Sequence, residues 1–171
     1  MIFIFLYLLI TKLKMTREER FMQEAINLSL QGIDSNSGGP FGCIIVKGEA
    51  IVGRGNNMVT STNDPTAHAE VVAIRDACKN LKTFQLEDCE VFTSCEPCPM
   101  CMGAIYWARP KSVYFANTRT DAADIGFDDS MIYEELTCSH EDRKIPILSI
   151  GRDEALKVFE KWKNKADKVK Y

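Results

Sequence analysis

The sequence has few histidines and prolines, and it has no apolar run of the ~20 residues that a transmembrane helix needs. Among its 171 residues, only two are His and six are Pro. It also has no internal repeat and no low-complexity linker. Hydrophobic residues make up 46% of the chain and charged residues 26%, which is ordinary for a globular protein and excludes a fibrous, collagen-like or largely disordered chain. At ~100–200 residues per domain, the length corresponds to one compact domain.

The chain also lacks an excess of positive charge. Its 21 Lys and Arg residues face 24 Asp and Glu residues, for a net charge of −3. This balance disfavours tight binding to a phosphate backbone, although a local basic groove would be compatible with it. We therefore expect neither a nucleic-acid partner nor stable membrane association. The seven cysteines are an odd number in a long chain, which is not typical of a secreted disulfide framework and favours the reducing cytoplasm.

The apolar stretch at residues 1–10 allows three interpretations. It could be a translated upstream segment, a weak membrane anchor, or an element that packs on the domain. The first is favoured because Thr16 and Glu19 have the spacing of a capping box, so that a helix can begin directly after Met15. We therefore treat residues 1–14 as an apolar extension that need not belong to the native chain, and residues 15–171 as a single domain.

Hydrophobic periodicity and turn residues predict an α/β protein. A hairpin followed by alternating helices and strands indicates a mixed sheet of about five strands, with helices on both faces and the later strands parallel. Gly32 is expected to end the first helix. Helices are expected at 16–31, 65–81, 97–108, 121–125, 130–136 and 153–168, and strands at 42–47, 51–54, 90–93, 112–116 and 145–150.

Two short segments contain the residues best suited to chemistry. Cys98 and Cys101 lie three residues apart at the start of a predicted helix, which places both sulfurs on one face and favours thiolates. His68 lies in the first turn of another predicted helix, residues 65–81. One imidazole and two thiolates would leave the fourth position of a tetrahedral zinc ion open for water, as a catalytic site requires. Glu70 follows His68 by two residues and could accept a proton from that water.

The same residues permit other interpretations. Cys95 could join Cys98, Cys101 and His68 in a closed Cys₃His site, which would make the protein a non-catalytic zinc module. Cys98 and Cys101 could instead form a redox pair, although such a pair needs no upstream His-x-Glu. Replacement of Cys95 discriminates between the open and the closed site.

The His-Ala-Glu of residues 68–70 and the Pro-Cys-x-x-Cys of residues 97–101 form the signature of zinc nucleobase deaminases. Over residues 16–171 the sequence resembles that superfamily, and it is most similar to the bacterial guanine deaminases of the cytidine-deaminase fold. The segments that carry this resemblance are residues 38–42, 57, 64–70, 94–101, 103–109, 126–130 and 171. Residues 1–14 have no counterpart in the family pattern.

The resemblance implies a three-layer α-β-α sandwich and hydrolysis of guanine to xanthine and ammonia. It implies one Zn²⁺ per chain, bound by His68, Cys98 and Cys101, with Glu70 as the catalytic acid and base. It further implies a homodimer in which the C-terminal segment is exchanged between subunits and caps the neighbouring active site.

The resemblance also assigns residues to the substrate. Asn57 would bind the purine, Phe41 would stack near it, and Asp129 and Tyr171 would help to recognise the base. Asn57 could equally serve local backbone hydrogen bonds in a loop, and Asp129 could interact with a helix dipole. Guanosine, cytosine or its nucleotides, and adenosine in tRNA are the alternative substrates. The Phe-Asp-Asp-Ser of residues 127–130 favours guanine by resemblance.

Overall fold

The computed structural model describes residues 15–170, so the expectations for residues 1–14 and for Tyr171 lie outside the described residues. The residue contacts divide the chain after Asp128 into two compact units, and each unit is described by itself. The first contains α2 (Arg17–Asp34), β1 (Gly42–Lys47), β2 (Ala50–Asn56), α3 (Val59–Thr62), α4 (Ala69–Leu81), β3 (Cys89–Cys95), α5 (Pro99–Ala108), β4 (Ser112–Asn117) and α6 (Arg119–Asp124). The second contains α7 (Ser130–Thr137) and α8 (Arg152–Lys163).

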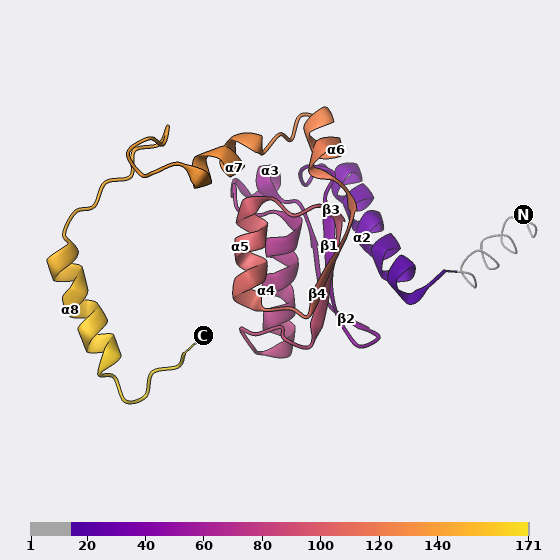
Figure 1. The fold of residues 1–171 in the computed structure, drawn as a ribbon. Coiled ribbons are helices and arrows are strands. Elements are labelled where there is room, and N and C mark those ends of the chain that lie inside the picture. Colours follow the sequence, from indigo (N-terminus) through magenta and orange to yellow (C-terminus); the bar gives the residue numbers. More distant parts are fainter. Residues whose placement is uncertain (1–14, 171) are drawn as a thin grey trace, which may run out of the picture. The chain divides into compact units, whose positions relative to one another are not determined.

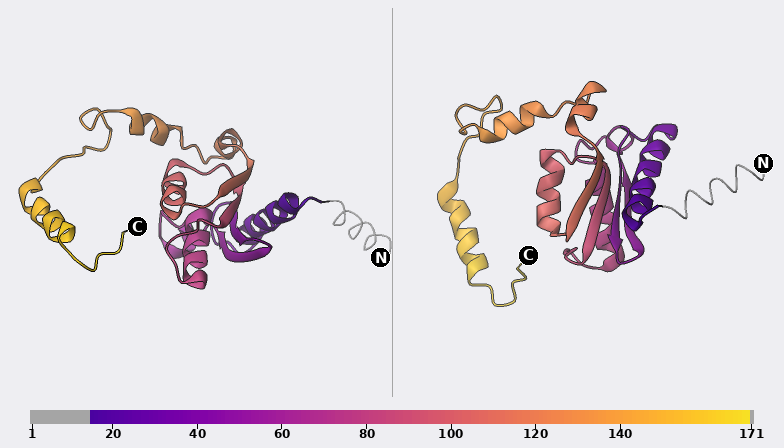
Figure 2. Two further views of the ribbon diagram at one scale, coloured as in Figure 1. Left: turned by 60° about the horizontal axis from the view of Figure 1, so that its bottom comes forward. Right: turned by 45° about the vertical axis from the view of Figure 1, so that its right-hand side comes forward.

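The first unit is built around a mixed sheet with the strand order β2-β1-β3-β4. Strand β1 is antiparallel to β2 and β3, whereas β3 and β4 are parallel. Helix α2 covers one face of the sheet, and α4 and α5 cover the other (Figures 1 and 2). This arrangement confirms the expected α/β fold with three layers.

The number of strands differs from the sequence prediction. The sheet has four strands within the described residues, rather than about five, because residues 145–150 form no strand. Pro146 interrupts this apolar run and has no N–H to donate to a neighbouring strand. The pattern of apolar residues alone therefore predicted one strand too many, at residues 145–150.

The sheet has a hydrophobic core on each face, because successive side chains on a strand point to opposite sides. Toward α2, one cluster joins β1 and β3 to the helix, and the Phe92 ring lies 5.4 Å from Phe21 and 4.6 Å from Tyr114, centroid to centroid. Toward α4, the second cluster contains Cys43, Ile45, Ala69, Ala73, Ala77, Leu86, Cys89, Val91 and Ala108. The small alanines allow α4 to lie close to the sheet.

Helix α2 begins as predicted and ends later. The Glu19 carboxylate accepts from the Thr16 backbone N–H at 2.8 Å, and the Glu19 N–H donates to the Thr16 hydroxyl at 3.2 Å, which completes the capping box. Gly32 was expected to end the helix but lies inside it, and Ser35 is the C-cap. A Cβ atom at Gly32 would lie 3.0 Å from the Asn56 side chain. This glycine therefore permits close packing of α2 near β2.

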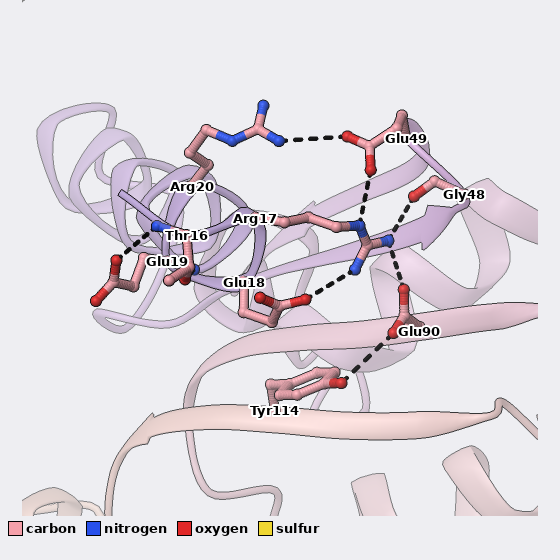
Figure 3. A network of polar contacts seen from close by, with 9 residues as sticks. All are labelled: Thr16, Arg17, Glu18, Glu19, Arg20, Gly48, Glu49, Glu90 and Tyr114. Atoms are coloured by element: carbon pink, nitrogen blue, oxygen red, sulfur yellow. Dashed lines mark hydrogen bonds and ion pairs between the residues drawn. The ribbon is translucent and has the colours of Figure 1, made fainter. Parts of the chain in front are cut away.

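Arg17 ties the start of α2 to the sheet (Figure 3). Its guanidinium donates to Glu49 at 2.9 Å, and to Glu90 and the Gly48 carbonyl at 2.5 Å. The Tyr114 hydroxyl donates to the other oxygen of Glu90 at 3.5 Å. Hydrogen bonding to Glu90 is the largest of the interactions that raise the pKa of Arg17. One cation thus joins α2, the β1–β2 hairpin and β3.

Among the described residues, no helix combines the length and the apolar character needed to cross a bilayer.

Helix α4 lies against β2 at positions where only glycine fits. A Cβ atom at Gly55 would lie 2.3 Å from the Ala69 carbonyl oxygen and 2.6 Å from the Ala73 nitrogen. A Cβ atom at Gly53 would lie 2.5 Å from the Ala73 carbonyl oxygen. Because both obstacles are backbone atoms, a larger residue would have to push the helix away from the strand. These two glycines fix the position of α4, which begins directly after His68.

We expect Gly55→Ala to lower the free energy of unfolding by about 3 kcal/mol, because overpacking forces backbone shifts. Urea unfolding of the purified protein measures this change. The matched control is Gly103→Ala in α5, where a Cβ atom would meet no heavy atom within 4 Å. That control is expected to raise the free energy of unfolding by ~0.5–1 kcal/mol, because alanine favours a helix. Equal effects of the two substitutions would contradict the close approach of α4 to β2.

Candidate active site

Two helix N-termini supply the residues of the candidate site. His68 is the N-cap of α4, with φ −69° and ψ 154°, and Cys98 is the N-cap of α5, with φ −65° and ψ 168°. Neither side chain makes a capping hydrogen bond to the backbone of its own helix. An N-cap side chain normally accepts from the first turn of its helix. Both side chains are instead directed toward each other and toward Cys101 in the first turn of α5.

Both helices begin later than the sequence predicted, at Ala69 rather than 65 and at Pro99 rather than 97. The Asp64 carboxylate accepts from the Thr66 N–H at 2.8 Å, which holds residues 64–66 in a turn. Pro99 occupies the first helical position, where the missing N–H costs nothing. The later starts make His68 and Cys98 the N-caps rather than residues inside the helices.

His68, Cys98 and Cys101 have the geometry of a tetrahedral metal site. The His68 Nδ1 atom lies 3.6 Å from the Cys98 sulfur and 3.5 Å from the Cys101 sulfur. Zn–N and Zn–S bonds of ~2.0–2.1 and ~2.3 Å at a tetrahedral angle give an N···S separation of about 3.6 Å. The three ligand atoms all lie within 4.8 Å of one another. The donor set therefore fits one zinc ion.

The two thiols differ in their protonation. The interaction with the Cys101 side chain, together with His68, lowers the pKa of Cys98 to about 4. The same interaction, together with burial, raises the pKa of Cys101. The interaction with Cys98 raises the pKa of His68. The site thus places negative charge on sulfur, which a divalent cation would stabilise.

Glu70 lies beside these three residues in the first turn of α4 and is only 6% exposed. Its Oε2 atom accepts from the Cys101 thiol at 3.3 Å, and its Oε1 atom accepts from the Thr93 hydroxyl at 3.0 Å. Burial raises the pKa of the carboxyl group, while hydrogen bonds from its own backbone N–H, Cys101 and Thr93 oppose that shift. A buried carboxyl group beside the candidate ligands is placed to accept and release a proton there.

Cys95 points away from the three candidate ligands. It is 5% exposed, and its thiol donates to the Thr118 carbonyl at 3.5 Å. Burial raises its pKa to about 11, so the neutral thiol is favoured. Within the described residues, the group with metal-ligand geometry contains His68, Cys98 and Cys101 without Cys95. This geometry favours the open site over the closed Cys₃His alternative.

Asn57 and Phe41 lie next to each other and close to the segment that carries His68. The Asn57 N–H donates to the Phe41 carbonyl at 3.0 Å, and the Met58 N–H donates to the Ala67 carbonyl at 2.9 Å. The Asn57 side chain is buried, and its Oδ1 atom accepts from the N–H groups of Gly39 and Val59, each at 3.2 Å. Because both partners are donors, the amide oxygen must face them and the NH₂ group must point the other way.

The two remaining predicted site residues are placed differently. Asp129 is the N-cap of α7 and the first residue of the second unit. Tyr171 lies outside the described residues. The structure thus brings together His68, Cys98, Cys101 and Glu70, with Asn57 and Phe41 held to the same part of the first unit.

Two neighbours of the predicted residues did not emerge from the sequence. Thr93 contacts Glu70 from β3, and Phe127 packs edge-to-face on Phe41 with ring centroids 4.9 Å apart and an interplanar angle of 88°. Two-residue periodicity along β3 could have indicated that Thr93 shares a face with Val91. Phe127 belongs to the segment 127–130 that carries the family resemblance, but its contact with Phe41 could not be inferred because the segment has no regular periodicity.

Comparison with known proteins identifies two kinds of relative. The chain is 54% identical to the guanine deaminase of Bacillus subtilis over 90% of its own length and 98% of that protein. The X-ray structure of the same enzyme matches with a TM-score of 0.87 over the same shares of the two chains. The chain is also 33% identical to the tRNA-specific adenosine deaminase of Buchnera aphidicola, over 90% of this chain and 99% of the relative.

A further solved structure is a protein in complex with 8-azaguanine. It is 31% identical to this chain and matches with a TM-score of 0.63, covering 67% of this chain and 65% of the other. The relatives thus act on, or are bound to, purine bases, either free or within tRNA.

We expect Cys95→Ser to retain one zinc ion per chain, because the Cys95 sulfur donates to a carbonyl instead of facing the ligands. Mass spectrometry of the purified protein, with elemental detection, counts the metal. Cys98→Ser is the matched control and is expected to lose most of its zinc, because a hydroxyl group replaces a thiolate ligand. Loss of zinc in Cys95→Ser to the same extent would establish the closed site.

The family assignment rests on the region that holds the site. Residues 15–117 match the cytidine and deoxycytidylate deaminase zinc-binding region. That stretch includes His68, Glu70, Cys98 and Cys101, and it is more than half of the chain. The protein therefore belongs to the zinc-dependent cytidine and deoxycytidylate deaminase family.

Proposed function

We propose that this protein catalyses the hydrolytic deamination of guanine to xanthine and ammonia. The main support is the 54% identity to Bacillus subtilis guanine deaminase, which extends over nearly all of both chains. The structures of the two proteins match with a TM-score of 0.87. The arrangement of His68, Cys98, Cys101 and Glu70 supplies the hydrolytic chemistry that this reaction needs. The proposal accounts for both the metal-ligand geometry and the buried carboxyl group.

His68, Cys98 and Cys101 would hold one zinc ion, which when bound would lower the pKa of a water molecule from 15.7 to ~7. Two thiolates and a neutral imidazole cancel the charge of the ion. Glu70 then accepts a proton from the water through the carboxylate oxygen that faces Cys101. It would pass this proton to N3 of guanine while the oxygen of the water adds to C2. It would then carry the proton of the new C2 hydroxyl group to the amino group, so that the C2–N bond breaks and ammonia leaves xanthine. One carboxyl group serves as base and as acid in successive steps.

Asn57 and Phe41 bind the base in this proposal. The side-chain oxygen of Asn57 already accepts from the N–H groups of Gly39 and Val59. Its NH₂ group is therefore the part that donates to an acceptor atom of the purine. Phe41 is held by the edge of Phe127 and offers a ring surface for the base. Asp129 and Tyr171 complete the recognition of guanine, as the family resemblance implies.

We further propose a homodimer in which the C-terminal segment is exchanged between subunits. The division of the chain after Asp128 supports this arrangement, because the second unit is a separate compact body. Helix α8 places Leu156, Phe159 and Trp162 at helical spacing, yet it buries none of its residues. An amphipathic helix with no buried residue is stabilised by packing on a partner. The exchange would bring Tyr171 to the neighbouring site.

We also propose that the enzyme works in the cytoplasm. All seven cysteines are free thiols. Cys98 and Cys101 must remain reduced to bind zinc, and the cytoplasm provides that condition.

Deamination of adenosine in tRNA is the second candidate, because a relative that is 33% identical over 90% of the chain is a tRNA-specific adenosine deaminase. The net charge of −3 disfavours it, because a tRNA substrate calls for a basic surface.

Ammonia release from guanine, guanosine and a tRNA anticodon stem-loop, measured side by side on the full chain, decides among these functions. We expect release from guanine, with one zinc per chain. Release from guanosine would retain the chemistry but replace the substrate. Release from the stem-loop alone would establish the second candidate.

Glu70→Ala tests the role of the carboxyl group. We expect kcat to fall by about 10²–10⁴-fold, because proton transfer is removed, while zinc remains bound. The control is Glu24→Ala, which removes an exposed carboxylate from α2. A variant that loses both zinc and activity would show that Glu70 maintains the metal site instead of transferring protons.

Deletion of Tyr171 tests the proposed C-terminal contribution. We expect kcat/KM to fall by about 10–100-fold, the range for loss of a hydrogen bond to a charged or strongly polarised group. The melting temperature and the molar mass by light scattering should not change. The control is Lys170→Ala, one residue earlier. Unchanged kinetics after the deletion would remove Tyr171 from the site.

A further inference from the structure

Thr93 is a polar residue at a position that suits an aliphatic one. It lies on β3, an inner strand of the sheet, where its Cα atom pairs with Cys43 of β1 and Phe115 of β4. It shares its face of the strand with Val91 and is 1% exposed. Valine has the same shape as threonine and would avoid the cost of burying a hydroxyl group. The hydroxyl therefore requires a partner.

That partner is Glu70. The Thr93 hydroxyl donates to Glu70 Oε1 at 3.0 Å, whereas Oε2 accepts from the Cys101 thiol at 3.3 Å. The two oxygens of the carboxylate thus face different surroundings. Oε1 faces the central strand of the sheet, and Oε2 faces the candidate zinc ligands.

We propose that Thr93 is a positioning residue, which holds Oε1 of Glu70 so that Oε2 alone accepts and releases the protons of the reaction. The inference rests on the proposed function of Glu70 and extends it to a specific oxygen. The terminal torsion of a glutamate side chain is broad, so burial by itself does not fix the plane of the carboxylate. A hydrogen bond to one oxygen from a rigid strand does fix it.

The proton balance follows from this arrangement. As a zinc-ligating thiolate, Cys101 would donate no proton to Oε2, whereas Thr93 would still donate to Oε1, so a proton taken from water resides on Oε2. The same oxygen releases it to the substrate, and Glu70 returns to its initial state. Thr93 keeps its own proton throughout and does not contact the reacting atoms.

The first measurement compares steady-state kinetics of Thr93→Val and Thr93→Ser with the wild-type protein, on the base that the wild type deaminates. We expect Thr93→Val to lower kcat by about 10–100-fold, with KM changed less than threefold and zinc content unchanged, because the substrate contacts remain. Thr93→Ser restores the hydroxyl and should recover most of kcat. A kcat of Thr93→Val within twofold of wild type would overturn the proposal, as would an equally slow Thr93→Ser.

The second measurement is independent of activity. Thr93→Val is expected to lower the melting temperature by about 3–8 °C when Glu70 is present, and to leave it unchanged or higher in the Glu70→Ala background. Equal shifts in the two backgrounds would show that the hydroxyl and the carboxylate are not coupled, and would contradict the proposal. If the wild-type protein has no activity on guanine, the proposed function is contradicted. The melting temperatures of the variants then still test whether Thr93 positions Glu70.

Ser94 provides the matched control on the same strand. Its hydroxyl is also buried, but it lies on the opposite face, where it accepts from the Gly42 N–H at 3.0 Å. Ser94→Ala should lower the melting temperature without the selective loss of kcat. An equal loss of kcat in Ser94→Ala would mean that any buried hydroxyl of β3 affects turnover, and would overturn the specific role of Thr93.

Discussion

The site depends on two helix N-cap residues, His68 and Cys98, whose side chains make no capping hydrogen bond. His68 and Cys98 have the extended backbone of N-cap residues, yet their side chains meet at 3.6 Å instead of satisfying the first turns of α4 and α5. Each helix thereby gives up a stabilising contact worth ~1 kcal/mol. In exchange, two rigid helices hold the two candidate ligands in place. The positive ends of the two helix dipoles also favour thiolates.

The rest of the first unit keeps these N-termini in place. Glycines of β2 let α4 lie close to the sheet, and alanines of α4 fill the narrow space between them. Strand β3 leads directly into the segment that carries Cys98, so its register sets the start of α5. The backbone atoms beside Gly55 leave little room for adjustment. A small shift of α4 would move His68 and Glu70 together, because both belong to its first residues.

The sequence predicted the elements of the site better than their surroundings. Helical geometry and ligand chemistry predicted that four residues meet at the starts of two helices, namely His68, Glu70, Cys98 and Cys101. The structure brings these four residues together there. The prediction that Gly32 ends the first helix was wrong because glycine can also serve close packing. The prediction of a strand at 145–150 was wrong because an apolar run becomes a strand only beside a partner strand. Thr93 was missed because its role depends on a contact with a residue 23 positions away.

On the proposed assignment, the division of the chain separates the hydrolytic residues from two of the four residues that bind the base, Asp129 and Tyr171. The zinc-binding region of the family ends at residue 117, within the first unit, whereas Asp129 and Tyr171 belong to the second. Metal, water and a carboxyl group suffice to hydrolyse an amino group from any suitable ring. Their geometry therefore carries little information about which ring is bound. On the proposed assignment, the residues that distinguish guanine from other bases lie largely beyond the hydrolytic centre, so one rigid centre can serve relatives with different substrates.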